Sequence, residues 1–225
     1  MKRLTPQRLI FLAFAGTILL GTLALYFESH RSGRALDWTD AAFTATSATC
    51  VTGLVVKSTG GDFSLGGQAI ILVLIQVGGF GILTFSSWFL LLLGRRPSMS
   101  QQLHLTQSLS LGPRLRWYQI VGRAVIYTLT IEALGAALLF VRFLPRFEAP
   151  KALYFAVFHS VSAFCNAGFD LFGNSLVDYT NDLFVNIVFI ALIILGGIGF
   201  YVLEELRLAA IAKARGKRWS WSLHA

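Results

Sequence analysis

The sequence predicts an all-α integral membrane protein, and three observations support this fold class. Hydrophobic residues make up 55% of the 225 residues and charged residues only 13%, whereas a soluble globular domain carries about 25% charge. The mean hydropathy is +0.66. The apolar residues also gather in blocks that are too long for the core of a soluble protein. A disordered chain is excluded, because it would need a low hydrophobicity.

Four apolar segments are long enough to cross a bilayer, which takes about 20 residues of helix. In chain order these predicted transmembrane helices are residues 9–27, 65–93, 117–141 and 183–203. The first segment is longer than the 7–15 apolar residues of a signal peptide, so we expect a retained helix. Two further apolar segments, 41–56 and 152–169, are too short to cross as helices. Each lies between two spans, so the order span, short segment, span occurs twice.

The distribution of charge predicts the orientation in the membrane. The net charge is +8, but the basic residues form short clusters between apolar blocks, which is typical of membrane flanks and excludes nucleic acid as a partner. The clusters fall on one side of the membrane if both short segments enter from the other side and return to it. The positive-inside rule then places both termini in the cytoplasm. The membrane is expected to be the plasma membrane, which in a bacterium is the inner membrane.

The repeated order coincides with a weak sequence repeat. Aligning residues 44–54 with 159–169 gives four identical pairs: Ser47 and Ser162, Ala48 and Ala163, Cys50 and Cys165, Gly53 and Gly168. Downstream, a Gly-Gly-x-Gly run begins at Gly78 and another at Gly196. We therefore expect an internal duplication. Its two helix–pore-loop–helix units are residues 1–94 and 117–212, with a cytoplasmic linker at 95–116 and a basic cytoplasmic tail at 213–225.

Each short segment has the pattern of a half-helix followed by an extended stretch that closes on a glycine. The half-helices are expected at residues 38–49 and 151–164, where Asp37 and Pro150 suit helix starts. Non-helical backbone at membrane depth survives only when it is buried in protein or lines a water-filled path. The pattern therefore predicts two re-entrant pore half-helices in addition to the four transmembrane helices.

The two strings Cys50-Val51-Thr52-Gly53-Leu54 and Cys165-Asn166-Ala167-Gly168-Phe169, with the glycine-rich helices after them, resemble the Trk/Ktr/HKT superfamily of cation transporters. The resemblance covers essentially the whole chain, but matches only the first two of the four units that these proteins carry. It implies potassium uptake across the plasma membrane through a carbonyl-lined selectivity filter, within a pseudo-fourfold pore. The intact Gly53 favours potassium over sodium, because members that select sodium often carry serine there. Sodium selectivity stays open as an alternative.

The resemblance assigns ion binding to the two loops. Backbone carbonyls can replace the hydration shell of an ion, and those of Val51, Thr52, Asn166 and Ala167 are the expected ligands of potassium. Glycine adopts positive φ at little cost, so Gly53 and Gly168 would turn these carbonyls toward the pore axis. The alternative is that both glycines merely end helices. Potassium is then the substrate, and no cofactor and no catalytic residue are expected. The two cysteines give neither a disulfide framework nor the spacing of a metal site.

Two loops cannot surround an ion, so the pore needs a second copy of the chain or a missing C-terminal half. The alternative is a non-conducting half-transporter or fragment that only scaffolds a partner. Membrane lipid surrounds the chain in either case. The resemblance also implies a cytoplasmic nucleotide-binding regulatory subunit at the basic face of residues 95–116.

Other residues have two interpretations each. Glu132 is the only acid inside a predicted span and is either functional or the structural partner of a buried donor, such as Arg123 or a backbone amide near a filter. The Gly-Gly-x-Gly runs either allow close helix packing or form a flexible point. An intramembrane enzyme using His159, Ser160 and Glu132 is disfavoured, because neighbouring residues on a helix point about 100° apart, a poor start for a nucleophile and its base.

Overall fold

The computed structural model describes residues 6–81 and 117–214. Within these two ranges the secondary structure is helical and no strand occurs, which confirms the predicted all-α class for this part of the chain. The helices are α1 (Pro6–Arg31), α2 (Trp38–Cys50), α3 (Thr59–Asp62), α4 (Leu65–Gly79), α7 (Trp117–Phe143), α8 (Ala149–Phe164), the short 3₁₀ helix η1 (Val177–Tyr179), α9 (Leu183–Gly197) and α10 (Phe200–Ala214).

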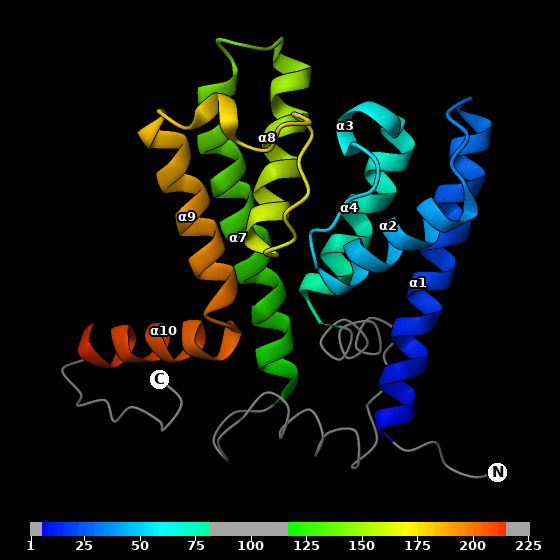
Figure 1. Cartoon of the computed structure of the whole chain (residues 1–225). Helices are drawn as coiled ribbons and strands as arrows, with labels where there is room; N and C mark the ends of the chain where they lie inside the picture. Colours follow the sequence, from blue (N-terminus) through cyan, green and yellow to red (C-terminus); the bar gives the residue numbers. More distant parts are fainter. Residues whose placement is uncertain (1–5, 82–116, 215–225) are drawn as a thin grey trace.

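The helices form two groups that meet in the middle of the molecule. Helices α1, α2 and α4 pack together, α7, α8 and α9 pack together, and α4 contacts α8 between the groups (Figure 1). Helix α8 starts at the end of the molecule drawn at the top, α2 starts well below that end, and both stop partway through the molecule. With 13 and 16 residues they are only about 20 and 24 Å long. The chain then returns to the top in both groups.

The helix starts follow local sequence signals. Ser64 caps α4 by accepting a hydrogen bond from the backbone N–H of Gly67, and Asp182 caps α9 in the same way through Val185. Pro150 lies in the first turn of α8, where its missing N–H costs nothing. Asp37 occupies the predicted cap position before α2, but its side chain makes no capping hydrogen bond.

Two helical stretches are long and apolar enough to cross a membrane, Phe11–Arg31 and Gly122–Phe143. The apolar helices α4 and α9 are shorter, with 15 residues each. The prediction of one continuous helix over 183–203 is wrong: α9 ends at Gly197, Gly199 has φ +88°, and α10 lies across the lower end of the bundle (Figure 1). The predicted span 65–93 is helical to Gly79. Its remainder beyond residue 81, and the linker 95–116, lie outside the described residues.

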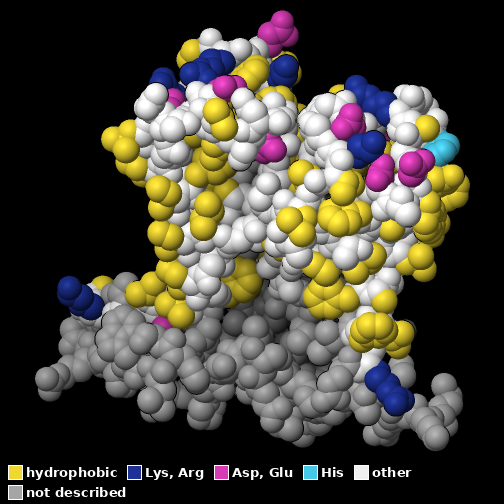
Figure 2. All heavy atoms as spheres, in the orientation of Figure 1, with side chains coloured by type: hydrophobic (Ala, Val, Ile, Leu, Met, Phe, Trp, Pro, Cys, Tyr) yellow, Lys and Arg dark blue, Asp and Glu magenta, His cyan; other side chains and the backbone are white. Residues whose placement is uncertain are grey.

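The lateral surface is apolar. Large hydrophobic side chains are exposed along the helices, among them Leu20, Leu129, Leu134, Ile187 and Ile190. Figure 2 shows apolar side chains over much of the flank, with many charged side chains at the upper end. A protein in water would bury such a surface, whereas lipid matches it.

Candidate ion-binding loops

Helices α2 and α8 end in the same backbone motif. The N–H groups of Val51 and Thr52 donate to the carbonyls of Ala48 and Ser47, at 3.3 and 3.0 Å. At the end of α8, the N–H groups of Asn166 and Ala167 donate to the carbonyls of Ala163 and Ser162, at 3.0 and 2.7 Å. This pair of bonds defines a Schellman motif, which needs a left-handed residue after the helix.

That left-handed residue is not glycine at either site. Val51 has φ 57° and Asn166 has φ 58°. Asparagine tolerates this conformation, but for a β-branched residue it is a genuine outlier that costs about 1–2 kcal/mol. Backbone strain of this kind concentrates at ligand sites, where the surrounding structure maintains it.

Gly53 and Gly168 lie two residues further on and bring the two loops together. Their φ angles are +75° and +72°. A Cβ atom added to Gly53 would lie 2.8 Å from the carbonyl oxygen of Ala167, and one added to Gly168 would lie 3.3 Å from the Cα of Gly53. Both the dihedral angle and the close approach therefore require glycine. Since Val51 and Asn166 already end the helices, ending them is not the role of these glycines.

The predicted ion ligands have free carbonyl oxygens. Among the described residues, none donates a hydrogen bond to the carbonyl of Val51, Thr52, Asn166 or Ala167. Backbone carbonyls away from other partners need water or a cation. Ala167 is completely buried, whereas Thr52 and Asn166 are exposed. The contact at Gly53 thus places two sets of unpaired acceptors beside one another.

The aligned serines of the two segments each fasten their own loop. Thr52 donates through Oγ1 to Ser47 Oγ at 2.9 Å. Ser162 donates through Oγ to the carbonyl of Phe169 at 2.7 Å. Both serines are buried. Each loop is therefore held to its half-helix by the backbone on one side and by a hydroxyl on the other.

The first glycine of each Gly-Gly-x-Gly run packs against the end of the half-helix of its own group. A Cβ on Gly78 would lie 2.2 Å from the carbonyl oxygen of Thr49, and one on Gly196 would lie 1.7 Å from that of Phe164. Thr49 and Phe164 immediately precede the two aligned cysteines. Of the two interpretations of these runs, close packing therefore accounts for their first glycines.

Glu132 does not pair with Arg123, which was one of the possible partners in the structural interpretation. Arg123 instead binds Glu204 of α10, together with Tyr127 and Arg207. Burial alone would raise the pKa of the Glu204 carboxyl, but hydrogen bonds from Arg207 and Tyr127 and the two positive charges outweigh it and lower this pKa. Glu132 lies elsewhere on α7, where its Oε1 accepts from Gln76 Nε2 at 3.1 Å.

The side chains considered for an intramembrane enzyme, His159 and Ser160, make structural hydrogen bonds instead. His159 donates from Nδ1 to the Phe155 carbonyl at 2.7 Å and accepts at Nε2 from the N–H of Leu171 at 3.2 Å, so the ring is neutral. Ser160 donates to the backbone carbonyl of Glu132 at 2.7 Å. No nucleophile–base pair forms among these residues. Both cysteines are free thiols, and in the described ranges no cluster of metal-ligating side chains occurs.

Comparison with known proteins gives one family. The family model described as TrkH, a cation transport protein, matches residues 12–221. The chain is 36% identical over 204 residues to the Ktr system potassium uptake protein B of Bacillus subtilis, covering 91% of this chain and 46% of that protein. It is 39% identical over 207 residues to the potassium/sodium uptake protein NtpJ of Enterococcus hirae, with the same coverage. The chain thus spans about half the length of the curated relatives it matches.

Proposed function

Because the chain belongs to the TrkH family of cation transport proteins, we propose that it takes up potassium across the bacterial inner membrane as half of a pseudo-fourfold pore. The proposed selectivity filter consists of Val51, Thr52 and Gly53 in the first loop and Asn166, Ala167 and Gly168 in the second. The observation that carries this proposal is the set of carbonyls of residues 51, 52, 166 and 167, which have no donor in the described part of the chain, on two loops that touch at their glycines.

The physical mechanism is exchange of hydration for carbonyls. Removing water from potassium is costly, and a fixed set of backbone oxygens offsets that cost. Here the N–H groups of Val51, Thr52, Asn166 and Ala167 bind the helix ends, whereas the carbonyls of these residues have no donor among the described residues. The positive φ of Val51 and of the two glycines is incompatible with helix or sheet, and the packing around the loops maintains it. Such loops select by holding the oxygens at distances that suit one ion.

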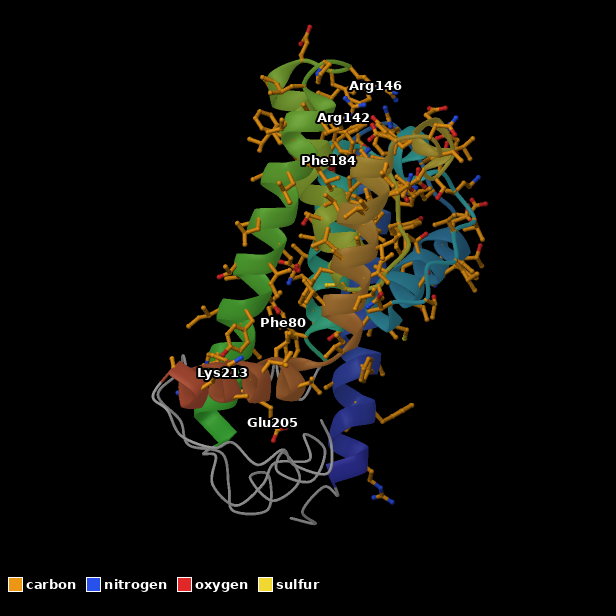
Figure 3. The ribbon with its side chains drawn as sticks, turned by 90° about the vertical axis from the view of Figure 1, so that its left-hand side faces the viewer. Phe80, Arg142, Arg146, Phe184, Glu205 and Lys213 are labelled. Carbon is orange, nitrogen blue, oxygen red and sulfur yellow. The ribbon has the colours of Figure 1, made fainter. Side chains whose placement is uncertain are left out.

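The proposed topology places both termini in the cytoplasm and makes α2 and α8 re-entrant. In this arrangement the units 1–94 and 117–212 each contribute one pore loop. It is supported by the position of the N-terminal end of α1 and of α10 at the same end of the molecule (Figure 1). Figure 3 places Lys213 at that end, and Arg142 and Arg146 at the opposite one. Arg142 pairs with Asp182 at 2.6 Å and Arg146 covers the ring of Tyr179, so the basic groups there are partly compensated.

Two loops surround at most half of an ion, so we propose that a second copy or a further half-chain completes the pore. A cytoplasmic nucleotide-binding regulatory subunit at the face that includes residues 95–116 belongs to the same proposal. The second candidate function is a half-transporter that scaffolds a partner without conducting. The relative from Enterococcus hirae is named for both potassium and sodium, so sodium is the competing substrate.

The test uses a bacterial strain that lacks its own potassium uptake systems. The chain is expressed alone and together with the half that completes the pore, and uptake of potassium is measured against increasing sodium. We expect Gly53→Ser and Gly168→Ser to weaken the preference for potassium. Gly33→Ser is the matched control, because Gly33 has φ +73° but nothing within 4 Å of an added Cβ. Absence of uptake in every assembled form, or a Gly53→Ser pore indistinguishable from the wild type, contradicts the proposal.

A further inference from the structure

One buried acid joins three helices directly behind the second loop. Glu132 of α7 is 5% exposed. Its Oε1 accepts from Nε2 of Gln76 on α4 at 3.1 Å and from Sγ of Cys165, at the end of α8, at 3.8 Å. Gln76 belongs to the first helical group and Cys165 to the second. The carboxyl group therefore links the two groups at the point where the second loop begins.

Cys165 is the residue through which Glu132 reaches the loop. It is the C-cap of α8, and the left-handed residue Asn166 follows it directly. A Cβ added to Gly79 of α4 would lie 2.3 Å from the Cys165 sulfur. The thiol thus fits between a glycine of the first group and the carboxyl of Glu132, and it has little room to change its rotamer.

The backbone of Glu132 is held to α8 as well. Ser160 donates to the Glu132 carbonyl at 2.7 Å. One turn further along α7, a Cβ on Gly135 would lie 2.6 Å from Ser160 Oγ. This contact fixes the height of the Glu132 side chain relative to the end of α8. A shift of the carboxyl relative to Cys165 would require α7 and α8 to slide past each other.

We propose that Glu132 is a positioning residue for the second loop: its hydrogen bond to Cys165, braced by Gln76 and Gly79, sets the placement of the Asn166 and Ala167 carbonyls and so the ion preference of the pore. The inference rests on the proposed function. Residues that orient ligand groups without touching the ion typically cost 10–100-fold in affinity when removed, through lost orientation alone.

Three variants distinguish the hydrogen bond between Glu132 and Cys165 from the negative charge of Glu132 and from the packing of its side chain. Glu132→Gln keeps an oxygen acceptor of the same reach, Glu132→Leu removes it, and Cys165→Ala removes the donor. Leu134→Ala is the control on the same helix as Glu132, because the Leu134 side chain lies on the apolar flank and is 62% exposed. Each is measured in the assembled pore by the concentration of sodium that halves potassium uptake, and by the maximal uptake rate. The amount of protein in the membrane and its unfolding temperature in detergent report on folding.

We expect Glu132→Leu and Cys165→Ala to lower the potassium preference by about tenfold, the lower end of the effect of lost orientation. Glu132→Gln should keep most of the wild-type preference, and Leu134→Ala should leave it unchanged. The carboxyl of Glu132 and the thiol of Cys165 act through one contact. A variant that carries both Glu132→Leu and Cys165→Ala should therefore lower the potassium preference no more than Glu132→Leu alone.

The inference is overturned if Glu132→Gln lowers the potassium preference as much as Glu132→Leu does. It is likewise overturned if the effects of Glu132→Leu and Cys165→Ala on this preference add in the double variant. It is also overturned if folded Cys165→Ala protein keeps the wild-type preference. These outcomes differ from failure of the proposed function, in which the wild-type protein itself shows no selective uptake and Gly53→Ser has no effect.

Discussion

Replacing Gly196 by alanine tests the packing of α9 against the second pore loop. The added methyl group would lie 1.7 Å from the carbonyl oxygen of Phe164, and ordinary contact begins at 3.4 Å. The obstacle is backbone, which cannot rotate away as a side chain does. Either α9 or the end of α8 must therefore move by about 1.7 Å. Since Phe164 lies two residues before Asn166, such a movement displaces the loop.

The expected energy follows from two opposed effects. Alanine is favoured over glycine within a helix by about 1 kcal/mol. Overpacking of a close contact costs about 1–3 kcal/mol, and more where the obstacle is rigid. We therefore expect Gly196→Ala to lower the free energy of unfolding by about 1–2 kcal/mol, which corresponds to roughly 2–8 °C in unfolding temperature for a chain of this size.

The neighbouring Gly197 supplies the control. An added Cβ there would meet only Asn166 Nδ2 at 3.7 Å, an ordinary contact. Gly197→Ala should keep or raise the unfolding temperature, measured by fluorescence-detected size-exclusion chromatography of heated detergent extracts. Equal unfolding temperatures for the two variants would refute the packing argument. Unchanged ion preference in Gly196→Ala pores would show that the loop does not follow the helix.

Two further predictions concern strain and a buried ion pair. Val51→Gly should raise the free energy of unfolding by about 1 kcal/mol, because it removes the cost of a left-handed β-branched residue; Asn166→Gly should change it less, and thermal unfolding in detergent compares the two. Glu204→Gln should destabilise the docking of α10 by about 1–3 kcal/mol, the cost of leaving charged donors unmatched. Because the folded-state pKa of Glu204 is lowered, its contribution is complete above the unfolded pKa of about 4.5. The contribution is lost as the pH falls through the folded pKa, so an acid titration of thermal stability should lose one step in Glu204→Gln; an unchanged titration would contradict the assignment.

The position of the loops could be predicted from the sequence because it depends on local signals. The sequence shows two apolar segments that are too short to cross a membrane as helices. Each is followed by a short loop that closes on a glycine. The Schellman ends were not predicted, because nothing in the sequence marks Val51 as left-handed. Valine disfavours that conformation, and only tertiary packing imposes it.

The partners of buried polar groups could not be predicted either. Glu132 and Arg123 lie on one helix, and their opposite charges suggested a pair. In the structure Arg123 forms an ion pair with Glu204, because the helix breaks at Gly199 and α10 then lies across the lower part of α7. A continuous helix through residue 203 would have carried Glu204 away from Arg123. The partner of Arg123 was therefore hidden by the error in the helix boundary.

The two aligned cysteines have the same place in their loops but different surroundings, and the difference bears on how the pore is completed. Cys165 is buried, and α4 of the preceding helical group packs against it through Gly79. Cys50 is exposed, and no preceding group exists within the described residues to cover it. In a closed ring of such groups, every loop would have a preceding inner helix at this position. The proposed assembly therefore predicts that an inner helix of a second copy or of a further half-chain covers Cys50.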